Sequence, residues 1–166
     1  MDLFRKFHLP LVVNYLFLFL LFSCKSYDHK TTKVESQTKA KNPLVLVTGG
    51  TGFIGSHILV ELMEASYDVV VIDNLLNSSK ESLKRIEKIT GKKVVEFFEK
   101  DLTKLDDIQM VFDKYRFDAV IHLAALKAVG ESVEKPIKYY SNNLIGALNL
   151  LKVMKKYHTK NLVFSS

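Results

Sequence analysis

The amino-acid sequence predicts an α/β protein built on a doubly wound parallel sheet, and three observations support this. Short apolar runs of strand length recur along the chain. Amphipathic segments of helical length separate these runs. A glycine-rich stretch, Thr48–Gly55, joins the first run to the first amphipathic segment. Strands that alternate with helices form a parallel sheet with helices on both faces, and the strand order 3-2-1-4-5 is expected.

The predicted strands are continuous apolar runs, as is typical of strands that are buried on both faces. They cover residues 44–47, 69–72, 94–98, 119–122 and 161–164. The predicted helices cover residues 54–65, a segment from Ser78 or Ser79 to about Thr90, and residues 105–114 and 142–157. One face of the first helix is expected to hold Ile54, Ile58, Leu59 and Leu62. We expect the fold to be truncated after the fifth strand.

Composition indicates a globular domain, because 48% of the 166 residues are hydrophobic and 25% are charged. The formal net charge is +6, but residues 43–166 carry 17 Lys/Arg against 15 Asp/Glu, a balance of only +2. This balance argues against nucleic acid as a partner. The single cysteine, Cys24, allows no internal disulfide. No His/Cys cluster has the spacing of metal ligands, so no metal site is predicted.

The N-terminal segment differs from the rest of the chain. Arg5 and Lys6 precede an apolar run over residues 9–22, and Cys24 follows it. This order is typical of a secretory signal peptide, and the run is shorter than the ~20 residues of a membrane span. We predict a signal-like or anchoring segment (1–24), a polar linker (25–42) and a folded domain (43–166). There are two alternatives: Cys24 carries a lipid, or this N-terminal segment lies outside the functional protein.

The glycine-rich connection predicts a dinucleotide-binding fold of the Rossmann type. Gly50-x-Gly52-x-x-Gly55 lies between an apolar strand and an amphipathic helix, and this context gives an otherwise weak pattern its meaning. The glycines allow a tight turn, a close approach of the backbone to a pyrophosphate, and packing of the helix on the sheet. The helix N-terminus offers N–H groups and a positive dipole to the phosphates.

An acidic residue at the end of the second strand predicts which dinucleotide binds. Asp73 follows Gly55 by 18 residues, close to the ~20 expected of a carboxylate that binds the adenosine ribose. A carboxylate there repels a 2′-phosphate, and the nearest following base, Lys80, is too far along the chain to offset it. The sequence therefore predicts NAD rather than NADP. Asp101, at the end of the third strand, fits either a contact with adenine or a helix cap.

Several stretches resemble the UDP-glucose 4-epimerases, which are extended short-chain dehydrogenases/reductases that bind NAD. The resemblance covers residues 44–166. It rests on Gly49-x-x-Gly52-x-x-Gly55, on the segment Asp73–Ser78, on the loop His122–Ser132 with its Leu-Lys-Ala-Val-Gly-Glu-Ser run, and on Lys135-Pro136, Tyr139–Asn143 and Gly146. The Leu-Lys-Ala-Val-Gly-Glu-Ser run is the most specific part, because related dehydratases and decarboxylases usually carry other residues there.

The resemblance implies a set of NAD contacts. They are, at the pyrophosphate, Gly49, Gly52, Phe53, Ile54 and Gly55; at the adenosine ribose, Asp73, Asn74, Asn77 and Ser78; at adenine, Asp101 and Leu102; and at the nicotinamide half, Leu123, Ala124, Lys127 and Asn142. Lys127 also has a physical argument, since a cation after the fourth strand lies at the carboxyl end of the sheet, where ligands bind. Leu123 stands where an aromatic residue is common, and Ala125 where glycine is common.

The catalytic residues that the resemblance implies are not found in this sequence. The superfamily uses Tyr-x-x-x-Lys, in which the lysine charge lowers the pKa of the tyrosine that acts as the base. None of the seven tyrosines has lysine four positions later. We expect this pair, and the catalytic serine or threonine, beyond Ser166. The resemblance implies interconversion of UDP-glucose and UDP-galactose through a 4-keto sugar, with no turnover by residues 1–166 alone.

Other functions stay open at this point. One alternative is another UDP-sugar epimerase or dehydratase of the same superfamily, and another is a non-catalytic NAD-binding module. A UDP-sugar is the expected substrate, no nucleic acid partner is expected, and a homodimer is left open. A cytoplasmic location is expected because nucleotide-sugar chemistry with free NAD normally needs the cytosol. Membrane association or export through residues 9–22 is the alternative.

Overall fold

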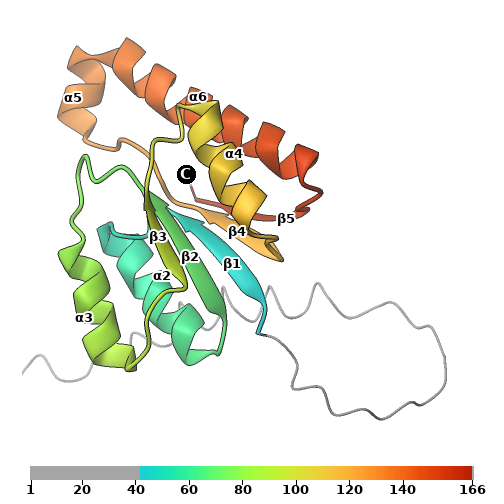
Figure 1. The fold of residues 1–166 in the computed structure, drawn as a ribbon. Coiled ribbons are helices and arrows are strands. Elements are labelled where there is room, and N and C mark those ends of the chain that lie inside the picture. Colours follow the sequence, from blue (N-terminus) through green and yellow to red (C-terminus); the bar gives the residue numbers. More distant parts are fainter. Residues whose placement is uncertain (1–41, 166) are drawn as a thin grey trace, which may run out of the picture. The chain divides into compact units, whose positions relative to one another are not determined.

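The computed structural model describes residues 42–165, which form a five-stranded parallel sheet between two layers of helices (Figure 1). The strands are β1 (Leu44–Thr48), β2 (Asp68–Asp73), β3 (Glu96–Glu99), β4 (Ala119–His122) and β5 (Asn161–Phe164). The helices are α2 (Phe53–Glu64), α3 (Glu81–Thr90), α4 (Leu105–Lys114), α5 (Val129–Glu134) and α6 (Pro136–Lys156). The strand order β3-β2-β1-β4-β5 confirms the predicted doubly wound fold.

β1 lies in the middle of the sheet, where both of its edges are paired. Val45 is in register with Val69 of β2 and with Ala119 of β4. Successive side chains of a strand point to opposite faces, so Leu46 joins the core beneath α4 and α6, and Val47 joins the core beneath α2. Because both faces are covered, every residue of β1 is buried, which explains the continuous apolar run in the sequence.

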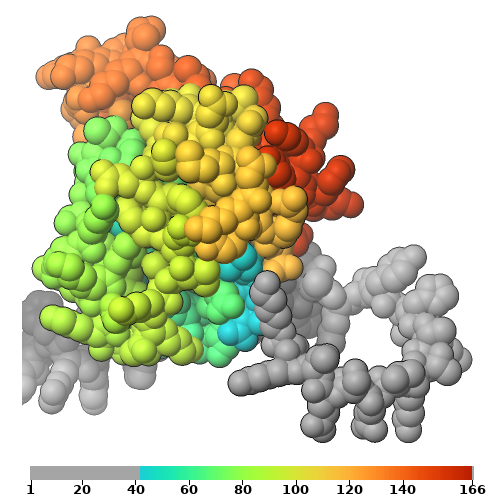
Figure 2. All heavy atoms as spheres, in the orientation of Figure 1, coloured from blue at the N-terminus to red at the C-terminus, as the bar shows by residue number. Residues whose placement is uncertain are grey.

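Each face of the sheet has its own hydrophobic core. On one face, α4 and α6 contribute Ile108, Val111, Phe112, Leu150, Val153 and Met154. On the other face, α2 and α3 contribute Leu59, Leu62, Met63 and Ile86. Figure 2 shows that α4 and the chain leading into it from β3 form much of the surface on the visible side. Full burial of one such side chain contributes about 1.5–3 kcal/mol to the stability of the fold.

Some element boundaries differ from the prediction. Helix α6 begins at Pro136 instead of Asn142, and α5 was not predicted from the sequence. Proline is favoured in the first turn of a helix, where its missing N–H group costs nothing, so Pro136 starts α6. Helix α3 begins at Glu81, whose N–H donates to Ser79 Oγ at 3.2 Å. Ile54, expected to face inward, is 47% exposed.

The predictions for the N-terminus lie outside the described residues. They concern the apolar run at 9–22, Cys24 and the linker, all of which precede Asn42. Between residues 42 and 165, no helix has both the length and the apolar character that crossing a membrane requires. The signal-like segment, its membrane association and the domain boundary therefore stay predictions.

Candidate dinucleotide-binding site

The β1–α2 connection brings a helix N-terminus to the carboxyl end of the sheet. β1 ends at Thr48, α2 begins at Phe53, and Gly52 is the N-cap residue. The first N–H groups of a helix have no partner within it. No side chain caps α2, and its first turn holds no acidic residue, so this end keeps its positive dipole. Such an end is suited to binding a phosphate.

The glycines of this connection are required for different reasons. Gly49 has φ +70°, and a Cβ atom there would lie 2.7 Å from the backbone nitrogen of Ala124. A Cβ at Gly55 would lie 2.2 Å from the carbonyl oxygen of Gly49. At Gly52 the nearest atom would be 3.4 Å away, which is an ordinary contact. Neighbouring protein atoms therefore do not require glycine at position 52, and the loop is open there to the close approach of a pyrophosphate.

Asp73, at the end of β2, links two loops at the edge of the site. The residue is 7% exposed, and its carboxylate accepts three hydrogen bonds. Oδ2 accepts from the Thr51 N–H at 3.2 Å, and Oδ1 accepts from the Leu75 N–H at 2.9 Å and from Ser78 Oγ at 3.0 Å. A carboxylate has about four acceptor positions, so Asp73 retains capacity on Oδ2 for a ligand hydroxyl.

Two lysines in this region are paired with acids. Lys80 Nζ lies 2.6 Å from the Glu99 carboxylate, and Lys100 Nζ lies 3.2 Å from that of Asp107. Lys80 was the nearest base that could have offset the charge of Asp73. Because Glu99 neutralises Lys80, the structure supports the prediction that a 2′-phosphate is disfavoured beside Asp73.

A cleft lies where the strands β2, β3 and β4 end. The loops after these strands and helix α6 form its walls. Seven residues predicted from the sequence to contact NAD line it: Asp73, Asn74, Asn77, Asp101, Leu102, Ala124 and Asn142. The predicted ribose and adenine contacts, which are separated in the sequence, are therefore brought to one cleft.

Asp101 does not cap α4. Its Oδ1 accepts hydrogen bonds from both the N–H and the hydroxyl of Thr103, at 2.9 and 2.8 Å, while the N-cap position of α4 is Lys104. The side chain thus stabilises the turn after β3 and borders the cleft.

Within residues 42–165, no three histidine, cysteine or acidic side chains lie close enough together to share a metal ion.

The loops after β1 and β4 are joined by Thr48. Its hydroxyl lies within hydrogen-bonding distance of the N–H groups of Leu123 (3.3 Å) and Ala124 (3.4 Å) and 2.7 Å from His122 Nδ1. Since the hydroxyl oxygen accepts from the backbone, its proton is left to donate to His122 Nδ1. Burial lowers the pKa of His122, which is consistent with a neutral ring in that role. His122 is therefore a structural residue that holds the hydroxyl of Thr48.

The sequence of this domain matches a known protein family. The model of the NAD dependent epimerase/dehydratase family matches residues 45–166. The chain belongs to this family. The match begins in β1 and includes the glycine-rich loop, Asp73 and the cleft, so the epimerase/dehydratase family fold contains the whole candidate site.

Individual members of the epimerase/dehydratase family are close in sequence and in structure. The chain is 55% identical over 122 residues to UDP-glucose 4-epimerase uge1 of Schizosaccharomyces pombe, covering 74% of this chain and 34% of that protein. It is 54% identical over 128 residues to the human UDP-glucose 4-epimerase, with 74% and 36% covered. The solved UDP-glucose 4-epimerase from Bifidobacterium longum, in complex with NAD+ and UDP, superposes with a TM-score of 0.72 at 52% identity, with 74% and 36% covered. The chain thus spans about a third of the length of these relatives.

Apart from the three glycines, five of the predicted contacts do not line this cleft themselves: Phe53, Ile54, Ser78, Leu123 and Lys127. Phe53 and Ile54 are exposed in the first turn of α2, beside Gly52. Ser78 donates to Asp73, and Leu123 packs partly against the core beneath α2. Lys127 is exposed and follows Leu126, which lines the cleft. These positions fit an epimerase/dehydratase-family cofactor site, although a direct contact for each residue stays a prediction.

Two asparagines of α6 that sequence reasoning missed hold the walls of the cleft. Asn143 accepts from the Leu126 N–H and donates to the Leu126 carbonyl, both at 2.9 Å. Asn149 Nδ2 donates to the carbonyls of Leu102 and Thr103, at 3.1 and 2.9 Å. Asn149 is buried among the apolar residues of α6. A polar residue on an apolar helical face was the feature of the sequence from which its structural role could have been predicted.

The contrast between Gly52 and Gly55 gives a test of the loop. Gly55→Ala should lower the free energy of unfolding by about 1–3 kcal/mol, because its Cβ would overlap backbone atoms. Gly52→Ala should leave it unchanged or raise it by about 0.4–1 kcal/mol, since alanine fits the backbone angles there. Urea unfolding of both variants measures the difference. Equal destabilisation of both would contradict the assignment.

Proposed function

We propose that this chain is the NAD-binding part of a UDP-glucose 4-epimerase. The observation that carries the proposal is the cleft at the carboxyl ends of β2, β3 and β4, next to an uncapped helix N-terminus and the buried carboxylate of Asp73. The specific activity is supported by relatives from yeast, human and bacterial sources, more than 50% identical, that are named UDP-glucose 4-epimerase.

The described residues fit NAD at three points. The open side of Gly52 and the first N–H groups of α2 would hold the pyrophosphate. Asp73 would accept hydrogen bonds from the adenosine ribose, with Asn74, Asn77 and Ser78 beside it. Lys127 and Asn142 would reach the nicotinamide half from the β4 loop and α6. The chemistry that NAD supplies when bound is reversible hydride exchange with C4 of the sugar, so no net redox change occurs.

The proton-transfer residues are proposed to lie beyond Ser166. In residues 1–166, no tyrosine is followed by lysine at the fourth position. Asp73, Lys127 and their neighbours are proposed to bind and orient the cofactor. We therefore propose that residues 1–166 bind NAD without turnover.

We propose the cytoplasm as the location, because the reaction uses nucleotide sugars and free NAD. An acylated Cys24 in the mature protein would contradict this. A different UDP-sugar epimerase or dehydratase of the family is the second candidate function, since the chain covers only about a third of the relatives' length and we propose that the residues that select the sugar lie outside that part. Conversion of another UDP-sugar in preference to UDP-galactose would favour it.

We also propose a homodimer formed through α6. This helix buries one side against the sheet and exposes large apolar side chains along the other. They are Ile137, Tyr140, Leu144, Ile145, Leu148 and Leu151, which we call the α6 stripe. Spacings of three and four residues place them on one helical face, which is the pattern of a helix that packs against another helix. A continuous apolar stripe of this kind marks an interaction site rather than scattered surface residues.

The proposed activity predicts a difference between the full-length protein and residues 1–166. The full-length protein should convert UDP-galactose to UDP-glucose with NAD bound. Residues 1–166 should bind NADH, detected by its fluorescence, and should show no conversion. Epimerase turnover by residues 1–166 alone would refute the proposed position of the catalytic pair, and absence of dinucleotide binding would refute the function itself.

Asp73→Ser should reduce discrimination against NADPH. Loss of a charged hydrogen bond to ribose should weaken NADH binding by roughly tenfold to hundredfold, while removal of the negative charge relieves repulsion of the 2′-phosphate. Fluorescence titration with NADH and NADPH measures the ratio of the two affinities. Asp68→Ser, at the other end of β2, is the matched control and should leave the ratio unchanged. An unchanged ratio in Asp73→Ser would show that this carboxylate does not select NAD.

Leu148→Glu should convert the proposed dimer to a monomer. A charge in the middle of the α6 stripe would be desolvated in a helix–helix interface, which is costly for an unpaired carboxylate. Sedimentation velocity of the full-length protein measures the oligomeric state. Met110→Glu introduces the same charge at an exposed position of α4 and should not alter it. A monomeric unmodified protein would show that the stripe is covered in some other way.

A further inference from the structure

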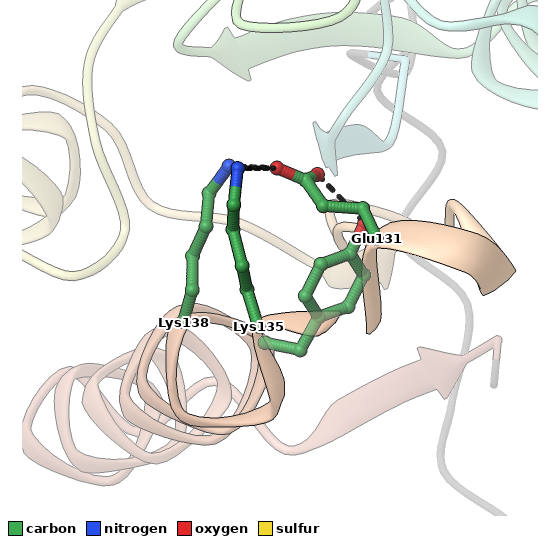
Figure 3. Close-up of polar contacts among 4 residues, drawn as sticks. Glu131, Lys135 and Lys138 are labelled. Atoms are coloured by element: carbon green, nitrogen blue, oxygen red, sulfur yellow. Dashed lines mark hydrogen bonds and ion pairs between the residues drawn. The ribbon is translucent and has the colours of Figure 1, made fainter. Parts of the chain in front are cut away.

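The loop that carries Lys127 is attached to α6 at both of its ends. At the first end, the side chain of Asn143 bonds both the N–H and the carbonyl of Leu126 at 2.9 Å. At the second end, Glu131 Oε2 accepts from the hydroxyl of Tyr139 at 3.0 Å, and Oε1 lies 2.7 Å from Lys138 Nζ. Figure 3 shows Glu131 reaching from α5 toward Lys138 of α6 and toward Lys135, which lies between the two helices. Residues 127–130, between the attachments, are all exposed.

Apolar packing does not hold this loop in place. Helix α5 has no buried residue, and its two valines, Val129 and Val133, are largely exposed. The polar contacts of Glu131 with α6 are therefore a main connection between α5 and the rest of the fold. Tyr139 supplies the fixed side of this connection, because its ring is buried while its hydroxyl reaches Glu131.

The two attachments come from adjacent turns of one helix. Tyr139 and Asn143 are four residues apart, so they lie on the same face of α6. The hydrogen bonds from Lys138 and Tyr139 lower the pKa of Glu131 to about 2, and Lys135 Nζ at 3.4 Å adds a second cation. The carboxylate is therefore ionised throughout the neutral pH range, and its contacts persist there.

We propose that Asn143, Glu131 and Tyr139 form a loop clamp whose task is to position Lys127 for the nicotinamide half of NAD. The proposal rests on the proposed function, which assigns Lys127 to that half. A lysine on a free loop would lose conformational entropy each time it bound, whereas a backbone fixed on both sides reduces that cost. These three are positioning residues, because they act through Lys127 and the clamp orients the loop rather than the ligand.

The test compares two ligands that differ in the nicotinamide half. NADH contains it, and ADP contains only the adenosine and the two phosphates. Asn143→Ala should weaken NADH binding by about tenfold, the scale of one or two lost hydrogen bonds, and leave ADP binding within about twofold. Both affinities are measured by calorimetry on the full-length protein. Equal weakening of both ligands would mean a general loss of structure and would overturn the clamp.

Tyr139→Phe is a second variant that keeps the buried ring and removes only the hydroxyl that bonds Glu131. It should weaken NADH by about threefold and spare ADP. Asn161→Ala is the matched control, since Asn161 Nδ2 also donates to a backbone carbonyl, that of Asp118 at 2.8 Å, but at the opposite end of the sheet. It should change neither affinity. Unchanged NADH binding in both clamp variants would refute the proposal.

A double-mutant cycle shows whether the clamp acts through Lys127. If it does, Asn143→Ala added to Lys127→Ala should weaken NADH no further than Lys127→Ala alone. Fully additive losses would show that Asn143 acts independently of Lys127 and would overturn the positioning role. Failure of the unmodified protein to bind either ligand would refute the proposed function together with the clamp, whereas NADH binding that all the variants retain would refute the clamp alone.

Discussion

The close contact between the backbones of Gly49 and Ala124 is the constraint on which the rest of the site depends. It exists because β1 and β4 are neighbours, and because Gly49 has a positive φ and no side chain to separate the two loops. Thr48 adds a hydroxyl that holds the N–H groups of the β4 loop and the ring of His122. From this point β1 continues into α2 on one face of the sheet, and β4 leads through α5 to α6 on the other. The cleft and the helix N-terminus lie at the carboxyl ends of the strands as a result.

Helix α6 organises the second side of the site through three asparagines. Asn149 fixes the turn after β3, Asn143 fixes the loop after β4, and Asn142 lines the cleft between them. Amide side chains suit this task because each can donate and accept at once, which satisfies backbone groups that have no partner in the sheet. The helix that supports the core with Leu150 and Val153 therefore also sets the positions of the loops around the cleft.

The strands, their order and the position of Asp73 at the end of β2 could be predicted because each leaves a local signal in the sequence. Buried strands appear as unbroken apolar runs, and the glycine pattern fixes the position of the following acid. Helix α5 could not be predicted in the same way, because it has no buried residue and so no apolar periodicity. The start of α6 at Pro136 was missed because a proline is compatible with either a break or a first turn. The partners of Asn143 are 17 residues away in sequence, and only the folded chain shows them.

The open space beside Gly52 has a consequence for the evolution of such folds. Gly49 and Gly55 are held by contacts within the protein, so selection for stability alone preserves them. Gly52 has no comparable neighbour, and only selection for the bound molecule would keep it as glycine. In a descendant that had lost its cofactor, position 52 would drift toward other amino acids while positions 49 and 55 stayed unchanged. The substitution pattern across these three sites would thus separate lineages that kept the ligand from lineages that kept only the scaffold.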